Sequence, residues 1–328
     1  MSQPKTASTW PGLVDLQVNG FGGIDFNSPS LQAADAEKVC RLLRSEGVVA
    51  FLPTLITNDF SRIESLAKTI LAAECSADDS TGARILGLHL EGPFISPHDG
   101  ARGAHPLEWV CKPDFDQLRR LHDKLDGRIR ILTCSPEWDG SPQFIEAVCK
   151  LGIRVALGHT MASHKQITEA IDAGASLSTH LGNAIPAMLP RHPNPIWSQL
   201  SDDRLWASLI GDGFHLPSEV LKTMLKVKGR QAFLVSDSTQ FAGMKPGRYQ
   251  TLIGGDVVLT KSGRLSMSHD ERLLAGSAMS LRRMIETLAL TDWLSFSDAW
   301  ELGSVRPWQY LGETAPLPTI PCPCDEIR

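Results

Sequence analysis

Five side chains that can bind a metal ion or transfer a proton stand at the ends of separate strand-like segments of this 328-residue sequence. Each segment is a short apolar run, and a buried strand can hold such a group only at its end, where a metal, water or substrate satisfies it. In a parallel α/β barrel the carboxyl ends of all strands open on one face, which carries the chemistry. The pattern predicts a metal-dependent hydrolase, and the five side chains are Glu91, His159, His180, His215 and Asp237.

One glutamate and two histidines form the predicted metal site. His89 and Glu91 project to the same side of a strand, toward the expected barrel mouth. Taken singly, Glu91, His159 and His180 would more often be structural residues than ligands. Together they leave coordination positions open for water, as catalytic zinc-type sites do. Zinc, iron(II) and other divalent ions suit this donor set.

The remaining polar residues of the strand ends and loops have two interpretations each. Asp237 can accept a proton from water and return it to a leaving group, or it can cap the following segment. His215, after Asp212, can polarise a carbonyl oxygen, or it is an ordinary surface histidine. Arg191 and His192 lie in a Pro-rich loop as candidate anion contacts, although loop arginines are most often simply solvated.

The composition is that of a soluble globular protein, with 42% hydrophobic and 21% charged residues. A formal net charge of -5 gives no reason to expect nucleic acid or an anionic membrane as a partner. Seven scattered cysteines, an odd number, favour reduced thiols, and no apolar run has the length of a signal peptide or a membrane span. We therefore expect a cytoplasmic protein.

Alternation of strand-like and helix-like segments predicts the fold. Eight such units with short links favour a closed TIM-type (β/α)8 barrel, with an open doubly wound sheet as the lesser alternative. The expected strands cover residues 13–18, 48–52, 85–90, 129–134, 154–157, 176–179, 206–210 and 232–235. The expected helices cover residues 33–45, 61–73, 116–125, 142–151, 165–173 and 218–228.

Four segments depart from this alternation. Residues 183–201 form a long Pro-rich loop that could be a lid or a subunit contact. Residues 257–260 and 264–267 read as the strands of a hairpin, and 292–301 as a last helix. The Pro-rich tail 314–328 is expected to be irregular, and its C-x-C pair, Cys322 and Cys324, is a weak metal signal that we interpret as tail.

Eight motifs occur in the order found in one enzyme family. Over about residues 10–312 the sequence resembles N-acetylglucosamine-6-phosphate deacetylases, members of the amidohydrolase superfamily, and the ordered set is far more specific than any single motif. The motifs are PGLVDLQVNG at 11–20, HLEGPFI at 89–95, GAHP at 103–106, GHT at 158–160, THLGNA at 179–184, DGFH at 212–215, VSD at 235–237 and LAGS at 274–277.

The resemblance implies a role for each matching residue. Glu91, His159 and His180 would be metal ligands, and Asp237 the general acid and base. An arginine that matches Arg191 reaches the sugar phosphate of a neighbouring subunit in the family, which implies a homodimer. The implied substrate contacts are Ala104, Asn183, Ala184, Arg191, Asp212, Gly213, Phe214, His215, Leu274, Ala275 and Gly276, with His105 close by.

The sequence departs from the family at several positions. Many amidohydrolases carry two histidines at the end of the first strand for a second metal, but Gln17 and Asn19 stand here. Amides are poor metal ligands, so we expect one divalent ion, zinc or iron(II). Gly182 and Ile185 replace a usual tyrosine and methionine, which could alter the sugar that is accepted.

The small β-sandwich domain of the family has no counterpart that we recognise in the sequence. We expect an N-terminal extension (1–10), a hydrolase barrel (11–312) and a Pro-rich tail (313–328). The predicted reaction is hydrolysis of the acetamide of N-acetylglucosamine 6-phosphate to glucosamine 6-phosphate and acetate. The alternative is an amidohydrolase for another N-acyl amino sugar or a cyclic amide. A barrel retained as a binding or regulatory protein, without enzyme activity, would be expected to lack at least one metal ligand or the base. Glu91, His159, His180 and Asp237 are all present.

Overall fold

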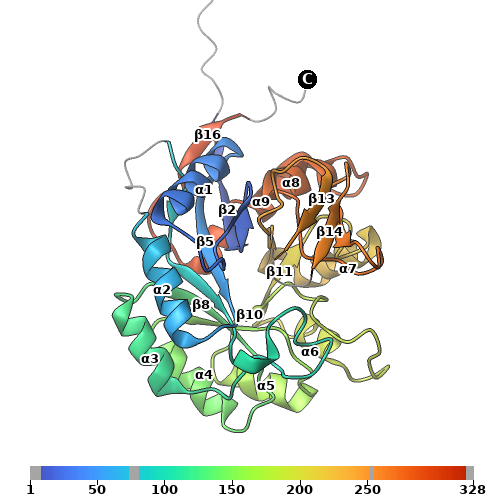
Figure 1. The fold of residues 1–328 in the computed structure, drawn as a ribbon. Helices are drawn as coiled ribbons and strands as arrows, with labels where there is room; N and C mark the ends of the chain where they lie inside the picture. Colours follow the sequence, from blue (N-terminus) through green and yellow to red (C-terminus); the bar gives the residue numbers. More distant parts are fainter. Residues whose placement is uncertain (1–8, 74–80, 252–254, 323–328) are drawn as a thin grey trace, which may run out of the picture.

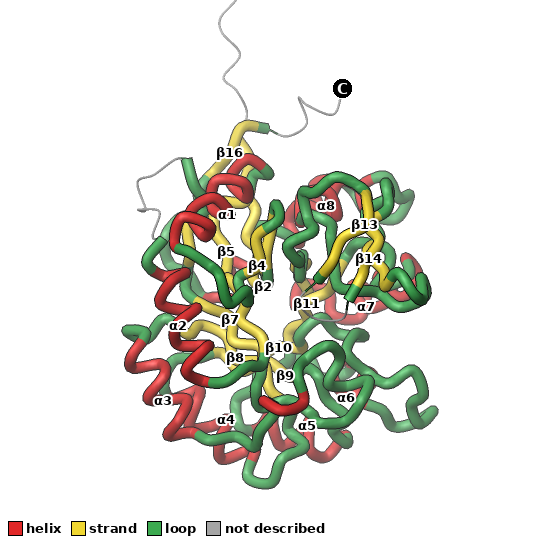
Figure 2. Tube along the Cα trace, viewed as in Figure 1, coloured by secondary structure: helices red, strands yellow, loops and turns green. Residues whose placement is uncertain are grey.

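A barrel of eight parallel strands forms the centre of the computed structural model, which describes residues 9–73, 81–251 and 255–322 (Figures 1 and 2). Neighbouring barrel strands pair in the order β2-β5-β7-β8-β9-β10-β11-β12, with the short β6 (Arg84–Ile85) beside β5. This confirms the predicted TIM-type barrel. The strands are β2 (Leu13–Val18), β5 (Val48–Ile56), β7 (Leu88–Glu91), β8 (Ile129–Cys134), β9 (Arg154–Leu157), β10 (Leu177–Ser178), β11 (Trp206–Ile210) and β12 (Ala232–Val235).

The last and first strands of the barrel meet through only a few hydrogen bonds. Val18 bridges to Ser238 beyond the end of β12, and the Asn19 N–H donates to the Ser238 carbonyl oxygen at 2.9 Å. Lower in the barrel, the Asp15 carboxylate accepts a hydrogen bond from the Ser236 N–H at 3.1 Å. A side chain therefore takes the place of a regular backbone ladder at this closure.

Helices surround the barrel on its outer side (Figure 1). Each of the six predicted helices is present within two residues of its predicted bounds, and the predicted last helix begins four residues later, at Phe296. The helices are α1 (Ala33–Ser45), α2 (Phe60–Leu71), α3 (Phe115–Lys124), α4 (Ser141–Lys150), α5 (His164–Asp172), α6 (Pro195–Leu200), α7 (Ser218–Lys228), α8 (Leu281–Ala289), α9 (Phe296–Leu302) and α10 (Val305–Leu311).

The expectation of an uninterrupted loop over residues 183–201 is wrong, because α6 lies within it. The Asn194 side chain accepts hydrogen bonds from the N–H groups of Ile196 and Trp197, and Pro195 occupies the first turn. Asparagine as N-cap followed by proline is a favourable helix start. The density of prolines concealed this signal, although a proline in the first turn does not oppose a helix.

Two small sheets accompany the barrel. The predicted hairpin is confirmed as β14 (Asp256–Leu259) and β15 (Leu265–Met267), to which β13 (Gly247–Gln250) adds a third antiparallel strand. This sheet has its own apolar cluster that includes Phe241 and Val257. After β2, the short strands β3 (Gly20–Phe21) and β4 (Ile24–Asp25) form a second hairpin.

The expectation of an irregular tail is wrong in part. Thr319–Pro321 is a strand, β16, that pairs antiparallel with β1 (Thr9–Pro11). Proline is tolerated there because a two-stranded sheet consists only of edges. Residues 314–318 and Cys322 are irregular, as predicted, and residues 323–328, Cys324 included, lie outside the described residues. The division into residues 1–10, 11–312 and 313–328 stays a prediction.

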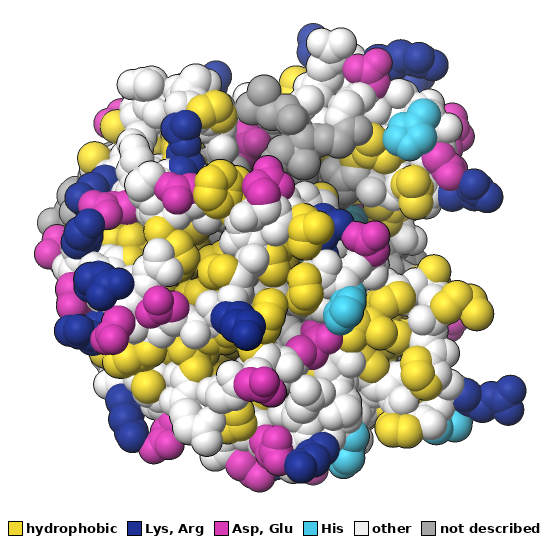
Figure 3. All heavy atoms as spheres, turned by 60° about the horizontal axis from the view of Figure 1, so that its bottom comes forward, with side chains coloured by type: hydrophobic (Ala, Val, Ile, Leu, Met, Phe, Trp, Pro, Cys, Tyr) yellow, Lys and Arg dark blue, Asp and Glu magenta, His cyan; other side chains and the backbone are white. Residues whose placement is uncertain are grey.

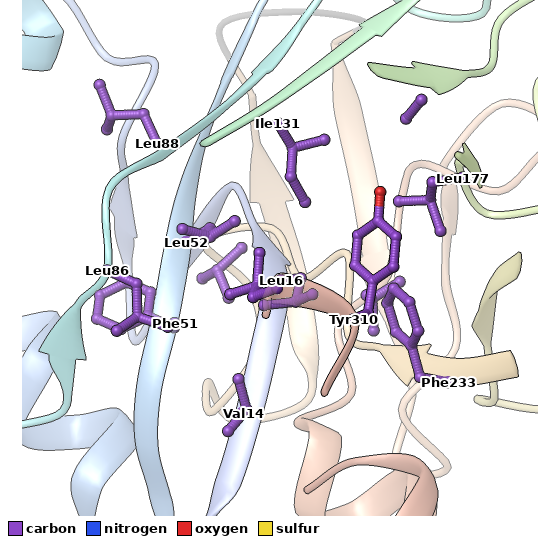
Figure 4. Packing of buried hydrophobic residues seen from close by; sticks show 14 of the residues in the cluster. Val14, Leu16, Phe51, Leu52, Leu86, Leu88, Ile131, Leu177, Phe233 and Tyr310 are labelled. Carbon is purple, nitrogen blue, oxygen red and sulfur yellow. The ribbon is translucent and has the colours of Figure 1, made fainter. Parts of the chain in front are cut away.

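The hydrophobic core lies inside the barrel and between the strands and the helices. Figure 4 shows part of it, with Phe51 and Leu86 on one side of the view and Leu177, Phe233 and Tyr310 on the other. The rings of Phe233 and Tyr310 lie 5.4 Å apart, which joins α10 to β12. Among the described residues, no helix combines the length and apolar character needed to span a membrane.

A pH-dependent stability difference follows from Asp15. Burial raises its pKa to about 7, and hydrogen bonds from Ser236 and Gln17 offset this only in part. The pKa of an aspartate in the unfolded chain is about 3.9, so between pH 4 and pH 7 the folded state holds a proton on Asp15 that the unfolded state has lost. Asp15 therefore lowers the stability of the protein as the pH rises from about 4 to 7. Asp15→Asn keeps the acceptor oxygen without the charge. The difference in free energy of unfolding between Asp15→Asn and wild type should therefore shift in favour of the variant by up to about 4 kcal/mol between pH 4 and pH 8.

Urea titrations at both pH values measure this difference. Asp116→Asn is the matched control, because Asp116 is an exposed aspartate on α3. It should keep the wild-type pH slope. An Asp15→Asn variant with the wild-type slope would contradict the assigned titration.

Candidate active site

The residues of the candidate site occupy strand ends on one face of the barrel. Glu91 is the last residue of β7, whereas His159, His180 and Asp237 each lie two residues beyond the ends of β9, β10 and β12. The backbone of these three residues is left-handed, with φ of 50°, 30° and 46°. Such a conformation costs about 1–3 kcal/mol for a residue with a side chain and persists where the surrounding structure enforces it. The barrel therefore holds these side chains at the mouth against a local backbone preference.

The three predicted ligands meet at one point. Glu91 Oε1 lies 3.0 Å from His180 Nε2 and 3.2 Å from His159 Nε2, and the two Nε2 atoms lie 3.2 Å apart. Three ligands on a tetrahedral zinc ion, with bonds of about 2.0–2.2 Å, would be separated by about 3.3–3.6 Å. The observed spacings are slightly shorter, so a small outward movement of the side chains accommodates an ion. The donor set and its geometry fit a divalent metal.

Surrounding groups orient these ligand atoms. The Ala101 carbonyl oxygen lies 3.0 Å from His159 Nδ1 and can only accept, so Nδ1 carries a hydrogen, and Nε2 is the atom that offers a lone pair to a metal once the ring is neutral. Gln17 Nε2 donates to Glu91 Oε1 at 2.9 Å. His180 Nδ1 is buried and has no hydrogen-bond partner among the described residues.

Glu91 and the two histidines stabilise each other's charged forms because they lie close together. Burial alone would raise the pKa of Glu91, but hydrogen bonds and charges of His159 and His180 hold it well below its usual range. Burial alone would lower the pKa of His180, but the hydrogen bond and charge of Glu91 raise it. The carboxylate is thus ionised and attracts positive charge, which a metal ion also supplies.

His105 is a fourth candidate ligand that the sequence placed only near the substrate. Ligand atoms of Glu91, His105 and His159 lie within 4.8 Å of one another. However, the Thr57 N–H points at His105 Nδ1, so the hydrogen of the neutral ring is on Nε2, 3.9 Å from Glu91 Oε2. Burial and the charge of His159 lower the pKa of His105 to about 3. His180, at 3.0 Å from Glu91, is the better third ligand.

Asp237 stands beside the cluster with a raised pKa. Burial and the charge of Glu91 raise it to about 6. Asn19 Nδ2 donates to Asp237 Oδ1 at 2.7 Å and fixes the carboxyl group. A pKa close to neutral suits a group that must accept and return a proton. Gln17 and Asn19, the two amides of β2 and its end, thus each hold one carboxylate of the site.

The predicted DGFH stretch forms a closed turn around Asp212. Asp212 Oδ1 accepts the N–H groups of Phe214 and His215 at 2.8 and 2.9 Å, and its Oδ2 lies 2.7 Å from His215 Nδ1. Burial alone would raise the pKa of Asp212, but the hydrogen bond and charge of His215 lower it. The carboxylate therefore holds the imidazole with Nδ1 protonated and Nε2 facing away.

Several of the predicted substrate contacts lie next to these groups or to residues that contact them. A Cβ on Gly103, which precedes Ala104, would lie 3.6 Å from His159 Cε1. Asn183 follows His180 and donates to its carbonyl oxygen at 3.2 Å. The loop of Leu274, Ala275 and Gly276 leads into Ser277, whose carbonyl oxygen accepts the Thr239 N–H two residues after Asp237.

Arg191 is the exception among the predicted contacts. Its side chain is exposed on the Pro-rich loop. No hydrogen bond or ion pair joins this side chain to another described residue. Within one chain, the structure therefore does not bring Arg191 together with the metal cluster.

The backbone at Gly182, where the resemblance implies a tyrosine, is one that favours glycine. Its φ is +95°, and a Cβ there would lie 3.0 Å from Leu216 Cδ2 and 3.1 Å from Met224 Cε. A tyrosine would be strained in this conformation. The loop after β10 therefore follows a course that requires glycine at this position.

Several supporting residues were missed in the sequence. Glu137, after β8, accepts hydrogen bonds from Ser135 Oγ at 2.6 Å and the Met161 N–H at 2.8 Å, and so fixes the loop that follows His159. Thr57 holds His105. Such residues carry no spacing signal, since their partners lie far away in the sequence.

Comparison with known proteins gives several close relatives, although no family model matches. An N-acetylgalactosamine-6-phosphate deacetylase from Escherichia coli O157:H7 is 32% identical over 312 residues, 92% of this chain and 78% of the relative. N-acetylglucosamine-6-phosphate deacetylases from Bacillus subtilis and Bos taurus are 32% and 34% identical, covering 94% and 92% of this chain and 76% and 74% of their own length.

Solved structures show the same similarity. The N-acetylglucosamine-6-phosphate deacetylase of Pasteurella multocida superposes with a TM-score of 0.83 at 25% identity, over 97% of this chain and 83% of that one. A variant of the Mycobacterium smegmatis enzyme, in complex with N-acetyl-D-glucosamine-6-phosphate, gives 0.79 at 27% identity, over 96% and 82%. With its barrel, its site and its relatives in agreement, this chain belongs to the N-acetylglucosamine-6-phosphate deacetylase family.

Proposed function

We propose that the protein hydrolyses the acetamide of N-acetylglucosamine 6-phosphate to glucosamine 6-phosphate and acetate. The observation that carries this is the convergence of Glu91 Oε1, His159 Nε2 and His180 Nε2 within 3.2 Å of one another beside Asp237. Relatives with 32–34% identity bear the name of this activity. The amide bond is the one cleaved, and water supplies the oxygen of the acetate.

A divalent ion, zinc or iron(II), is the proposed cofactor, held by Glu91, His159 and His180. Such an ion lowers the pKa of a bound water and polarises a carbonyl oxygen. Gln17 and Asn19 donate amide hydrogens to Glu91 and Asp237. They stand where the resemblance implies histidines for a second ion, and amides are poor metal ligands, which supports one ion per chain.

The protein side chains would divide the proton transfers between them. Asp237, oriented by Asn19, takes a proton from the attacking water and delivers it to the departing amine nitrogen. The Asp212 carboxylate orients the His215 ring through Nδ1, and the opposite nitrogen, Nε2, would polarise the carbonyl oxygen of the acetamide by a hydrogen bond from the imidazolium form. Collapse of the tetrahedral intermediate breaks the C–N bond and releases acetate and the free amine.

We further propose a homodimer in which Arg191 binds the phosphate of the partner's substrate. The exposed loop carries Met188, 87% exposed, and the half-exposed Trp197 follows it on α6. Leu107 and Trp109 add exposed apolar surface. Figure 3 shows groups of hydrophobic side chains on the face that it presents. Apolar patches of this kind mark interaction surfaces. The cytoplasmic location remains a prediction.

The galactosamine epimer is a second candidate substrate. The relative from Escherichia coli O157:H7 is named for N-acetylgalactosamine 6-phosphate. In this chain, Gly182 and Ile185 change the loop after β10, which we expect to contact the sugar. The ratio of kcat/KM for the two phosphorylated epimers decides between them.

The direct test measures acetate release together with metal content. Fully active protein should contain one divalent ion per chain, and chelation should abolish turnover, which the ion should restore. N-acetylglucosamine 6-phosphate should be the best substrate among the two epimers and the unphosphorylated sugar. Two ions per active chain would contradict the single-ion site, and no acetate release from any of these sugars would contradict the function.

Substitutions can separate metal binding from proton transfer. Asp237→Asn keeps an oxygen that accepts from Asn19 but cannot take a proton, so turnover should fall by ~10² or more while metal content persists. His159→Ala or His180→Ala should lose metal and activity together. Elemental analysis and initial rates measure both properties. Near wild-type turnover in Asp237→Asn would show that the base is another group.

Removing the Arg191 charge tests the phosphate contact. A charge-assisted contact contributes roughly 1.5–3 kcal/mol, so Arg191→Ala should lower kcat/KM for the phosphorylated sugar by about one to two orders of magnitude. Activity on unphosphorylated N-acetylglucosamine should barely change. An equal loss on both sugars would remove the phosphate assignment.

Mixed dimers test whether the arginine is shared. A dimer of one Arg191→Ala chain and one Asp237→Asn chain would contain one site with an intact base and an intact borrowed arginine. Equal random mixing should then restore about a quarter of wild-type activity. Activity that stays at the average of the two parent variants would show that each chain uses its own arginine.

A further inference from the structure

A row of hydrogen bonds crosses the barrel interior below the metal cluster. His89 Nδ1 lies 3.1 Å from the Leu16 carbonyl oxygen, and His89 Nε2 lies 2.7 Å from Thr133 Oγ1. Thr133 Oγ1 lies in turn 2.7 Å from Thr179 Oγ1. The three side chains are at most 3% exposed. We call Leu16, His89, Thr133 and Thr179 the His89 row.

The members of the row come from four strands or strand ends that carry the site. Leu16 precedes Gln17 on β2, and His89 lies two residues before Glu91 on the same side of β7. Thr133 belongs to β8, and Thr179 lies between the end of β10 and His180. Any shift along the row therefore moves the backbone from which Glu91 and His180 project.

The direction of each hydrogen bond in the row is determined. The Leu16 carbonyl oxygen can only accept, so His89 Nδ1 carries a hydrogen. Nε2 of the neutral ring then accepts from the Thr133 hydroxyl, and the Thr133 oxygen accepts from the Thr179 hydroxyl. Each hydroxyl donates once, and no hydrogen is left to rotate between alternative partners.

Gly158, after the end of β9, leaves room for the hydrogen bond between Thr133 and Thr179. Strand β9 lies between β8 and β10 in the sheet, yet the Thr133 and Thr179 hydroxyls meet across its end. A Cβ on Gly158 would lie 2.8 Å from Thr179 Cβ and 3.0 Å from Thr133 Cγ2. Gly158 immediately precedes His159. The absence of a side chain at this position is thus required for the contact.

We propose that the His89 row is a positioning device that fixes the strand ends of Glu91 and His180 and thereby sets the affinity of the metal site. His89, Thr133 and Thr179 are positioning residues, because none of them supplies an atom to the cluster of Glu91, His159 and His180. The proposal rests on the metal site of the proposed function. Partners behind metal ligands typically change metal affinity by 10–100-fold when they are removed.

Isosteric substitutions test the row. Thr133→Val and Thr179→Val remove one hydroxyl each and keep the β-branched shape. The dissociation constant of Zn²⁺ for the metal-free protein, measured by competition with a chelator, should rise about tenfold or more in each. Thr133→Ser, which restores the hydroxyl, should return to within about twofold of wild type. Both substitutions interrupt the same row. The dissociation constant of the double variant should therefore rise by less than the product of the two single increases.

Ser178→Ala is the matched control. Ser178 is the last residue of β10, directly before Thr179, and is fully buried. Its hydroxyl has no hydrogen-bond partner among the described residues. Removing this hydroxyl should leave the Zn²⁺ affinity unchanged. If Ser178→Ala weakened binding as much as Thr179→Val, the row would have no special role. Thermal unfolding of each metal-free variant shows whether it is folded.

Nitrogen-15 NMR of labelled histidine gives a readout that is independent of affinity. Metal-free wild-type protein should show His89 as the Nδ1–H tautomer, and Thr133→Val should perturb its Nε2 resonance. An Nε2–H tautomer in wild type, or Thr133→Val with unchanged Zn²⁺ affinity, would overturn the proposal. Wild-type protein that binds no Zn²⁺ would instead overturn the metal site itself.

Discussion

The buried negative charge of Glu91 is the constraint around which the site is organised. A carboxylate that is 3% exposed inside a barrel costs several kcal/mol unless it is compensated. His159 and His180 lie within 3.2 Å of it, and Gln17 donates an amide hydrogen. This compensation leaves a cluster of lone pairs and charge that fits a divalent cation. The residues that compensate the buried charge of Glu91 are therefore the same residues that form the metal site.

The barrel provides the rigidity that this arrangement needs. His159, His180 and Asp237 have left-handed backbone, and short loops alone would not maintain it. Parallel strands on both sides of β9 and β10, and β11 beside β12, fix the points where these loops begin. At the closure, Asp15 joins β2 to the strand that leads to Asp237, where a regular ladder is absent. The polar interior of the barrel thus supports the chemistry as well as the fold.

Predictions from hydrophobic periodicity succeeded for segments that are buried along their whole length. Five strands have the predicted bounds, because buried parallel strands are continuous apolar runs ended by turn residues. Residues 195–200 and 319–321 were misassigned for a different reason. Proline-rich sequence was equated with irregular structure, whereas proline fits the first turn of α6 and the edge strand β16. The signal for α6 was local, its Asn194 cap, whereas β16 depends on β1 at the other end of the chain.

The sequence by itself determined which residue types stand at which strand ends, and so the barrel, the Glu91–His159–His180 set and the family. It also showed amides at positions 17 and 19, where the resemblance implies histidines for a second metal. Only the tertiary structure decided the tautomer of His159 and the position of His105. The contact of Thr133 with Thr179 across Gly158 was likewise not visible in the sequence. Hydrogen-bond partners and close approaches arise when strands distant in sequence become neighbours, so no spacing along the chain records them.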